Sequence, residues 1–505
     1  MEEDFLTKPE KSFNKADIAF AFAALICGFL YCNLIRLSSP GAGVTIFALV
    51  LCSISFIYLK KSHITQNKES LIFLFLAALS SAQFMLFDNN FIGGLNFIFL
   101  SAVFIYWICL ATNNRLDNKL SIYIIGDAVK QGLSMPFLNF GCCASGVKSF
   151  SKNTKINKLL PALIGIIIFL PLIAVVINLL VSADLAFENF IKNIFAAISI
   201  DKLLTYIMQF IVGIPIAFYL YGSVYGNIKG RYAEKITAAS FDNTAKIIRI
   251  APKTAIYSIL TTFNIIYFIF FAVQAAYLFS AIGGNLPETF TYAEYARRGF
   301  FELCAVSGIN LGILIVSHLS VQRAAGEEPQ ALRIETIIIS LFTILLITTA
   351  LSKMVMYINA YGLTQLRVFT SWFMILLFFI FTVICIRQFK KFNASKFIIV
   401  GFIFLFITLS YSNADGLIAK YNINRYEEKT LLTLDTEMLS GLSDAAVPYI
   451  YDLYLHTDEN AVEMRQQLAA SINKNRQNDN GGFREFSFQR YRADKIRALL
   501  RANNF

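Results

Sequence analysis

The sequence is poor in charge and very poor in histidine. Charged residues make up 15% of the 505 residues and hydrophobic residues 56%, a balance far from that of a soluble domain of this length. The 3 histidines lie far apart, at positions 63, 318 and 456, so a histidine-rich metal site is not expected. We therefore expect neither a bound metal nor a cofactor.

Several motifs of well-known enzyme classes are also absent. No glycine-rich phosphate loop runs into Lys-Ser or Lys-Thr, so ATP-driven transport by this chain is not expected. Neither the His-Glu-x-x-His motif of zinc proteases nor the Gly-x-Ser-x-Gly motif of serine hydrolases occurs. The 8 cysteines lie in or beside apolar runs, and none follows Cys385. They predict packing residues and no disulfide framework.

Long apolar runs are what the sequence has in abundance. Each is long enough to cross the ~30 Å hydrocarbon layer of a bilayer as a helix of ~20 residues. The fold class predicted is therefore all-α, a polytopic transmembrane helical bundle in a lipid bilayer. We predict about eleven spans, at residues 16–36, 41–59, 70–87, 91–111, 157–181, 203–224, 253–282, 299–320, 333–352, 368–387 and 396–412.

The distribution of Lys and Arg predicts the orientation of the bundle. The connecting segments on one side carry several times more of these residues than those on the other side. By the positive-inside rule, residues 1–15 are a cytoplasmic N-terminus, and an odd number of spans places the C-terminal segment outside (N-in/C-out). Topology thus explains the net charge of +11, and we expect no nucleic-acid partner.

The chain divides into the N-terminus, a bundle at 16–412 and an extracytoplasmic helical tail at 413–505. Residues 121–146 predict an interfacial or partly re-entrant helix, because charges interrupt an apolar run. The basic cytoplasmic segment 225–252 predicts a surface helix on anionic lipid, or the docking site of a protein partner. The tail is expected to lean on the outer face of the bundle because it has little core of its own.

Three segments rich in charged and aromatic residues fall on the predicted outer side, at 287–303, 356–367 and 413–425. In the first, Glu294, Arg298 and Glu302 follow one another at i, i+4 spacing and form one helical stripe. Charge so close to lipid is costly unless it is paired or faces a wet cavity. The candidate ligand-binding residues of the three segments are Glu294, Tyr295, Arg297, Arg298, Glu302, Tyr357, Tyr361, Arg367, Asp415, Tyr421 and Arg425.

Two interpretations of these segments stay open. The ions either pair with one another and lock the helix ends, or they line an outward-facing cavity that binds a polar or anionic group. Arginine suits anions and tyrosine suits rings, so a lipid headgroup, a sugar or an envelope polymer would fit. The first hypothesis for the function of the protein is a non-enzymatic envelope sensor, accessory factor or transporter. The alternative is an intramembrane transferase for a lipid-linked group, with Glu294, Glu302 or Asp415 as acid or base.

Several stretches resemble a family of bacterial polytopic inner-membrane proteins catalogued as a domain of unknown function. The resemblance is carried by YAEYARRGFFEL at 292–303, AYGLTQLR at 360–367 and DGLIAKYNINR at 415–425, and in the tail by 442–448 and 486–493. It covers about residues 225–495, so the signature-bearing part of the bundle is 225–412. The resemblance implies a multi-pass protein of the bacterial cytoplasmic membrane with an outward-facing signature. It implies no activity.

Overall fold

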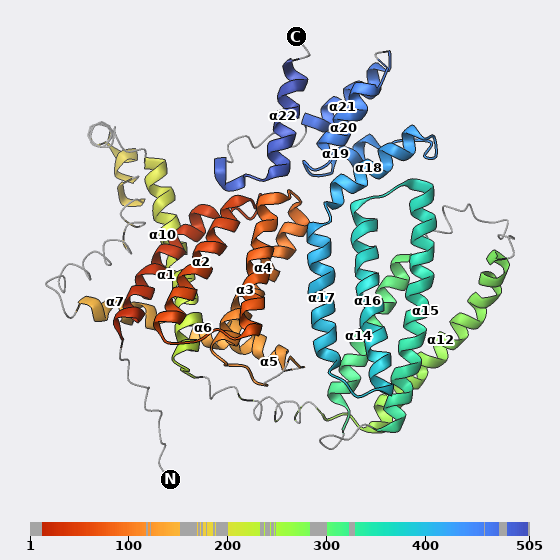
Figure 1. Cartoon of the computed structure of the whole chain (residues 1–505), viewed down its shortest axis with the longest axis horizontal. Helices are drawn as coiled ribbons and strands as arrows, with labels where there is room; N and C mark the ends of the chain where they lie inside the picture. Colours follow the sequence, from red (N-terminus) through yellow and green to blue (C-terminus); the bar gives the residue numbers. More distant parts are fainter. Residues whose placement is uncertain are drawn as a thin grey trace.

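The computed structural model describes residues 13–117, 120–121, 123–151, 200–232, 249–282, 300–322, 329–458, 460–473 and 482–502, and scattered residues at 169–187 and 237–247 (Figure 1). Every regular element in these residues is a helix. The predicted all-α class is confirmed.

Ten of the described helices are long and apolar enough to cross a membrane, and each coincides with a predicted span. The polytopic helical bundle is therefore confirmed, while most of the predicted span 157–181 lies outside the described residues. The ten are α1 (Lys15–Leu34), α2 (Ala42–Lys61), α3 (Lys68–Leu86), α4 (Asn90–Ala111), α10 (Ile200–Ile228), α12 (Lys253–Ile282), α14 (Phe300–Ser320), α15 (Gln330–Tyr361), α16 (Gln365–Phe389) and α17 (Ala394–Tyr411).

The N-terminal half of the bundle consists of α1–α4 and α10 (Figure 1). Its core is aromatic, with Phe20 stacked 4.3 Å from Tyr58 and 5.5 Å from Tyr221 between ring centroids. Helices α1 and α10 cross closely because each presents a glycine there. A Cβ added to Gly28 would lie 2.1 Å from the carbonyl oxygen of Gly213, so only these residues allow the approach.

The C-terminal half consists of α12 and α14–α17. Leu260, Ile347 and Phe381 are fully buried in its core. A polar contact also holds it: Asn310 donates from Nδ2 to Oγ1 of Thr343 at 2.8 Å. Such hydrogen bonds stabilise helix packing where the surroundings offer no water.

Helix α17 joins the two halves. Its Phe406 lies 4.7 Å from the ring of Phe99 in α4, and its Tyr411 donates a hydrogen bond from Oη to the carbonyl oxygen of Leu79 in α3. At the other end of α17, the side-chain amide of Asn393 donates to the carbonyl oxygen of Leu120. The halves thus meet along α17 and, at the tail end, also through Phe369 of α16, whose ring lies 4.9 Å from that of Phe91 in α4. We call the boundary between α17 and α3 the seam.

Short helices lie below the N-terminal half, at the end where α1 begins (Figure 1). They are α5 (Ile124–Val129), η1 (Lys130–Ser134), α6 (Met135–Leu138) and α7 (Cys142–Ser151). They hold the described part of the segment predicted to be interfacial. Buried Asp127 accepts a hydrogen bond from the backbone N–H of Leu116 at 2.9 Å, so its charged group is bonded to the chain between α4 and α5.

The tail forms a helical cap at the opposite end (Figure 1). It comprises α18 (Ala414–Glu427), α19 (Thr436–Ser440), α20 (Val447–His456), α21 (Val462–Asn473), η5 (Gly482–Glu485) and α22 (Phe488–Ala502). The expectation that it has little core is wrong, because the tail buries a core of its own to which α18 and α22 contribute. That core buries Ile418, Ala419, Ile423, Leu439, Leu442, Ala446, Val447, Ile450, Leu453, Leu468, Ile472, Ala493 and Leu500.

The two ends of the bundle differ in charge. We call the end away from the tail the basic end, because Lys and Arg flank the helices there, and the other end the tail end. The basic-end residues within the described ranges include Lys60, Lys61, Lys68, Arg115, Lys229, Lys253, Arg387, Lys390, Lys391 and Lys396.

Candidate functional site at the junction of tail and bundle

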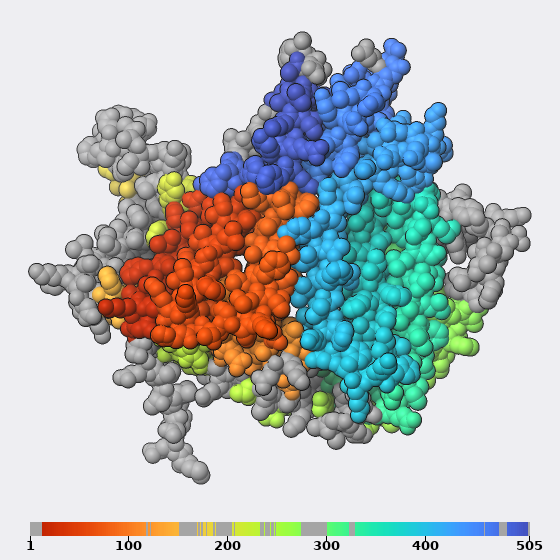
Figure 2. All heavy atoms as spheres, viewed as in Figure 1, coloured from red at the N-terminus to blue at the C-terminus, as the bar shows by residue number. Residues whose placement is uncertain are grey.

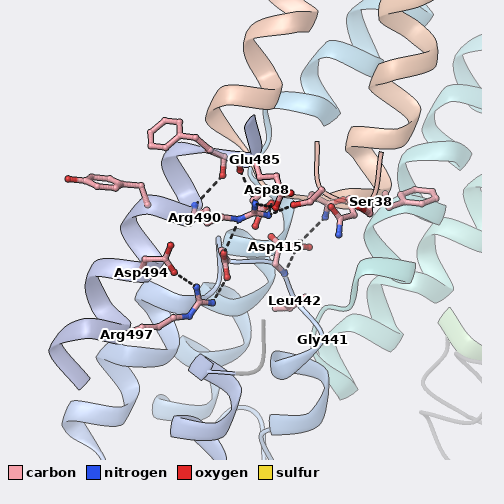
Figure 3. A pocket seen from close by; sticks show the side chains of 18 of the residues that line it. Ser38, Asp88, Asp415, Gly441, Leu442, Glu485, Arg490, Asp494 and Arg497 are labelled. Carbon is pink, nitrogen blue, oxygen red and sulfur yellow. Dashed lines mark hydrogen bonds and ion pairs between the residues drawn. The ribbon is translucent and has the colours of Figure 1, made fainter. Parts of the chain in front are cut away.

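A polar cavity of about 600 Å³ lies where the tail meets the tail end of the bundle (Figure 3). Its walls come from the loops after α1 and α3, from the first turns of α16 and α18, and from the tail. A volume of this size lies within the range of small-molecule sites. We call it the junction cavity. Its charged lining residues are Asp88, Asp415, Asp444, Glu485, Asp494, Arg490 and Arg497.

Arg490 of α22 ties the tail to the N-terminal half. Its Nη2 donates to Oδ1 of Asp88 in the α3–α4 loop and to Oγ of Ser39 in the α1–α2 loop, both at 2.8 Å. Its Nη1 donates to the carbonyl oxygen of Glu485 at 2.8 Å. Since the Arg490 side chain stays 26% exposed, a molecule in the cavity can reach it.

Arg497, about two α-helical turns further along α22, is instead enclosed in the tail. Its side chain is 4% exposed, and it donates to the carboxylate of Asp444, to Oδ1 of Asp494 at 2.8 Å and to the carbonyl oxygen of Ile472 at 2.8 Å. A buried arginine with this many acceptors holds the tail helices together. It has little capacity left for a ligand.

Asp415 accepts hydrogen bonds from three donors. It is 1% exposed and accepts from Nδ2 of Asn89 at 2.9 Å, from Nε2 of Gln365 at 2.7 Å and from the backbone N–H of Ser443 at 3.1 Å. The three donors come from the α3–α4 loop, from α16 and from the tail. One carboxylate therefore joins both halves of the bundle to the tail.

One hydroxyl group in the cavity wall lacks hydrogen bonds of this kind within the described residues. The Oγ of Ser443 is buried and has no hydrogen-bond partner within the described part of the chain. A buried hydroxyl without a partner is costly, so such a group points to a water or a bound molecule. Tyr491, also in the wall, is 50% exposed, and Nζ of Lys495 lies 4.6 Å from its ring centroid.

The environment of Asp88 changes its acidity. Burial raises the pKa of its carboxyl group, Arg490 lowers the pKa and nearby Asp444 raises it again, and the result is a pKa of about 7. Desolvation is the main cause of the raised pKa, the ion pair with Arg490 opposes it, and the nearby Asp444 carboxylate adds to it. Asp88 is thus an acid that exchanges its proton near neutral pH, in a loop outside the spans.

Five of the predicted site residues gather at a second place on the tail end, the C-terminus of α15. The guanidinium of Arg367 lies 4.0 Å from the ring centroid of Tyr357 and donates to the carbonyl oxygens of Tyr361 (3.1 Å) and Gly362. Arg425 donates to the carbonyl oxygen of Ile358 at 3.2 Å. Tyr421 is the fifth residue, and its ring centroid lies 5.6 Å from the Arg425 guanidinium as a cation–π partner. We call these residues the α15 cap cluster.

The α15 cap cluster satisfies the last carbonyl groups of a long helix, a role that cationic side chains commonly take at a C-terminus. Asn422 adds to it, accepting from the N–H of Leu363 at 2.7 Å and donating to its carbonyl oxygen at 2.8 Å. Among the described contacts, no ion pair or hydrogen bond links this cluster to Asp415. The predicted residues therefore lie at one end of the bundle but in two separate groups.

The remaining predicted residues belong to the stripe before α14. Glu302 lies in the first turn of α14, is exposed, and is near enough to Lys353 of α15 to interact with its charge. Glu294, Tyr295, Arg297 and Arg298 lie outside the described residues.

Six of the seven charged residues of the junction cavity were not among the predicted site residues: Asp88, Asp444, Glu485, Arg490, Asp494 and Arg497. Two signals could have found Asp88, Asp444 and Arg490. The polar run Asp88-Asn89-Asn90 interrupts two apolar spans, and the tail stretches 442–448 and 486–493 carry the family resemblance. In the described residues no group of three or more His, Cys, Asp or Glu side chains could hold a metal ion.

The Asp415→Asn substitution tests the role of this carboxylate. Its amide nitrogen would face donors, so we expect a loss of about 1–3 kcal/mol in the free energy of unfolding. Thermal unfolding in detergent and protease cleavage of the tail would measure it. Asp452→Asn, at a side chain 75% exposed, is the matched control and should change neither. Equal stability of the two variants would contradict a joining role for Asp415.

The pKa of Asp88 predicts a pH dependence of stability. The folded protein keeps a proton up to about pH 7 that the unfolded chain, with the ordinary value of 3.8, has already released. The contribution of Asp88 to stability therefore falls as pH rises through this window, and is smallest above pH 7. We expect Asp88→Asn to flatten the decline of the unfolding temperature between pH 5 and 8. Glu428→Gln, on the exposed tail surface, should keep the wild-type slope, and an equal slope in Asp88→Asn would contradict the assignment.

The profile of the family described as "Domain of unknown function (DUF4153)" matches residues 74–453, which includes Asp88, Asp415 and Asp444 but not Arg490. The match begins at residue 74, well before residue 225, at which the resemblance noted in the sequence begins. No curated protein and no solved structure matches the chain. This multi-pass membrane protein therefore belongs to the DUF4153 family.

Proposed function

We propose that the protein is a non-enzymatic receptor of the cell envelope, which binds a polar envelope component in the junction cavity on the outer side of the cytoplasmic membrane. The observation that carries the proposal is the cavity itself. It is polar, of about 600 Å³, and lined by the tail and by both halves of the bundle. A ligand there would touch all three parts at once.

The orientation is supported by the charges at the two ends. Lys and Arg flank the helices at the basic end, whereas the α3–α4 loop at the tail end carries none. By the positive-inside rule the basic end faces the cytoplasm, so the junction cavity opens outward. The family resemblance to bacterial inner-membrane proteins supports the same membrane.

The lining favours a hydroxyl-rich ligand over an anion. Five acids and two arginines line the cavity, and Arg497 is already enclosed by acceptors. Arg367 and Arg425, which suggested anion binding from the sequence, cap α15 instead. Carboxylates accept hydrogen bonds from hydroxyl groups, and the Ser443 hydroxyl has no partner among the described residues. Tyr491 adds a half-exposed aromatic ring to the wall. A sugar unit of an envelope polymer or glycolipid has this chemistry.

Binding has a direct route to the rest of the molecule. Arg490 makes the contacts between α22 and the loops of the N-terminal half. A ligand that competes for Arg490 or Asp88 would loosen the tail from that half, and one that bridges them would fasten it. A change of this kind suits a sensor or accessory factor, because only differential contacts can shift a conformational equilibrium.

An alternative function is transfer of a lipid-linked group, and Asp88 is the observation that favours it. Its pKa of about 7 suits a general acid or base near neutral pH. Asp415, which the sequence suggested for this role, is buried and already accepts three hydrogen bonds. The alternative predicts that Asp88→Asn abolishes turnover while ligand binding persists.

The orientation is tested with reporter fusions after Phe505 and within the loop at Lys391. Alkaline phosphatase should be active after Phe505 and inactive at Lys391, and green fluorescent protein should show the reverse pattern. A fluorescent fusion after Phe505 would contradict an outward-facing cavity.

The ligand class is tested with purified full-length protein in nanodiscs and three probes: diacetylchitobiose as a neutral sugar, glycerol phosphate as an anion and ethanolamine as a cation. We expect the sugar to bind best. Ser443→Ala should weaken sugar binding about fivefold through the loss of one hydrogen bond. Ser440→Ala, outside the cavity lining, should not change it. Binding that is equal in both variants, or preference for glycerol phosphate, would contradict the proposed class.

A further inference from the structure

A second cavity, of about 430 Å³, lies in the seam between the two halves. One wall is α3, with Ile72, Phe73 and Leu76, and the other is α17, with Val400 and Phe404. In Figure 2 this seam runs where the orange atoms of the N-terminal half meet the blue atoms of α17. We call this cavity the seam crevice.

The crevice is apolar along its length and charged only at the basic end. Glu69 and Lys396 are the charged residues in its lining, and they stand at the first turns of α3 and α17. Because both turns begin at the basic end, the charged mouth of the crevice lies at the bilayer surface and its apolar part reaches into the hydrocarbon region.

At the mouth of the crevice the acid is paired with a cation, and a second cation has no acid beside it among the described residues. Glu69 is neutralised by Arg115, whose Nη1 lies 2.6 Å from its Oε2. The Arg115 side chain is only 9% exposed, and its Nε is buried without a hydrogen-bond partner among the described residues. Lys396 is exposed and makes no salt bridge within the described ranges. Two cations against one acid leave the mouth positive.

We infer that the seam crevice binds one glycerophospholipid of the cytoplasmic leaflet, with an acyl chain between α3 and α17 and an anionic headgroup phosphate at Lys396. The inference is independent of the ligand proposed for the junction cavity. An apolar crevice within the bilayer has no water to fill it, and burial of methylene groups favours an acyl chain there. The positive mouth selects phosphate, as basic pockets between spans do.

Such a lipid would add to the contact between the two halves of the bundle. Between the halves, α17 contacts α3 and α4, and at the tail end Phe369 of α16 stacks 4.9 Å from Phe91 of α4. An acyl chain seated against Phe73 and Phe404 would extend that contact with apolar surface from both walls. The lipid would therefore stabilise the association of the halves and leave each half's own core unchanged.

The test uses the purified full-length protein, with bound lipid counted by native mass spectrometry after mild delipidation. Wild-type protein should retain about one phospholipid and, in nanodiscs, should prefer phosphatidylglycerol to phosphatidylcholine. Lys396→Gln should reduce this preference about fivefold, as expected for one basic residue near an anionic headgroup. Lys61→Gln, also exposed at the basic end but outside the crevice, should keep it.

A crevice-filling variant makes the test independent of charge. Leu76→Phe should displace the retained lipid while the protein stays folded, as judged by its size-exclusion profile and helical circular dichroism. Retention of one lipid by Leu76→Phe, or the same headgroup preference in Lys396→Gln as in wild type, would overturn the inference and leave only lipids that surround the bundle without a site. If Leu76→Phe fails to fold, Ile403→Phe on the opposite wall decides the same point.

Discussion

The tail, the N-terminal half and the C-terminal half are held at one point by the carboxylate of Asp415. Its three donors come from three parts of the chain that are far apart in sequence. Because the carboxylate is buried, each of these hydrogen bonds is needed to offset the loss of water around the charge. The position of the tail over the bundle, and with it the junction cavity, depends on this arrangement.

The bilayer explains why these polar contacts gather at the ends of the helices. Within the hydrocarbon layer each span satisfies its backbone internally and packs through rings and small residues, as in the close crossing at Gly28 and Gly213. Ion pairs that would be costly in that layer, such as Arg490 with Asp88, lie in the loops and tail. The chemistry of the protein is therefore concentrated where spans end and the tail begins.

The two groups at the tail end differ in what they leave available. In the α15 cap cluster, Arg367 and Arg425 are used to bond the last carbonyl groups of a helix. In the junction cavity, Arg490 is partly exposed and Ser443 has a hydroxyl without a partner in the described residues. A site for a ligand needs groups that are positioned and still unused, and this is why the junction cavity carries the proposed function.

The sequence by itself determined the class of the protein. Apolar runs of about twenty residues can cross a bilayer as helices, so ten of the eleven predicted spans were found without coordinates, as was the family resemblance. It also singled out Asp415 and the arginines as unusual. Only the tertiary structure decided which of these are structural, because the partners of Asp415, Arg367 and Arg425 lie on elements that periodicity cannot place beside one another. It likewise brought Asp88 to Arg490, about four hundred residues apart, since such a contact depends on how the tail docks and no local pattern encodes it.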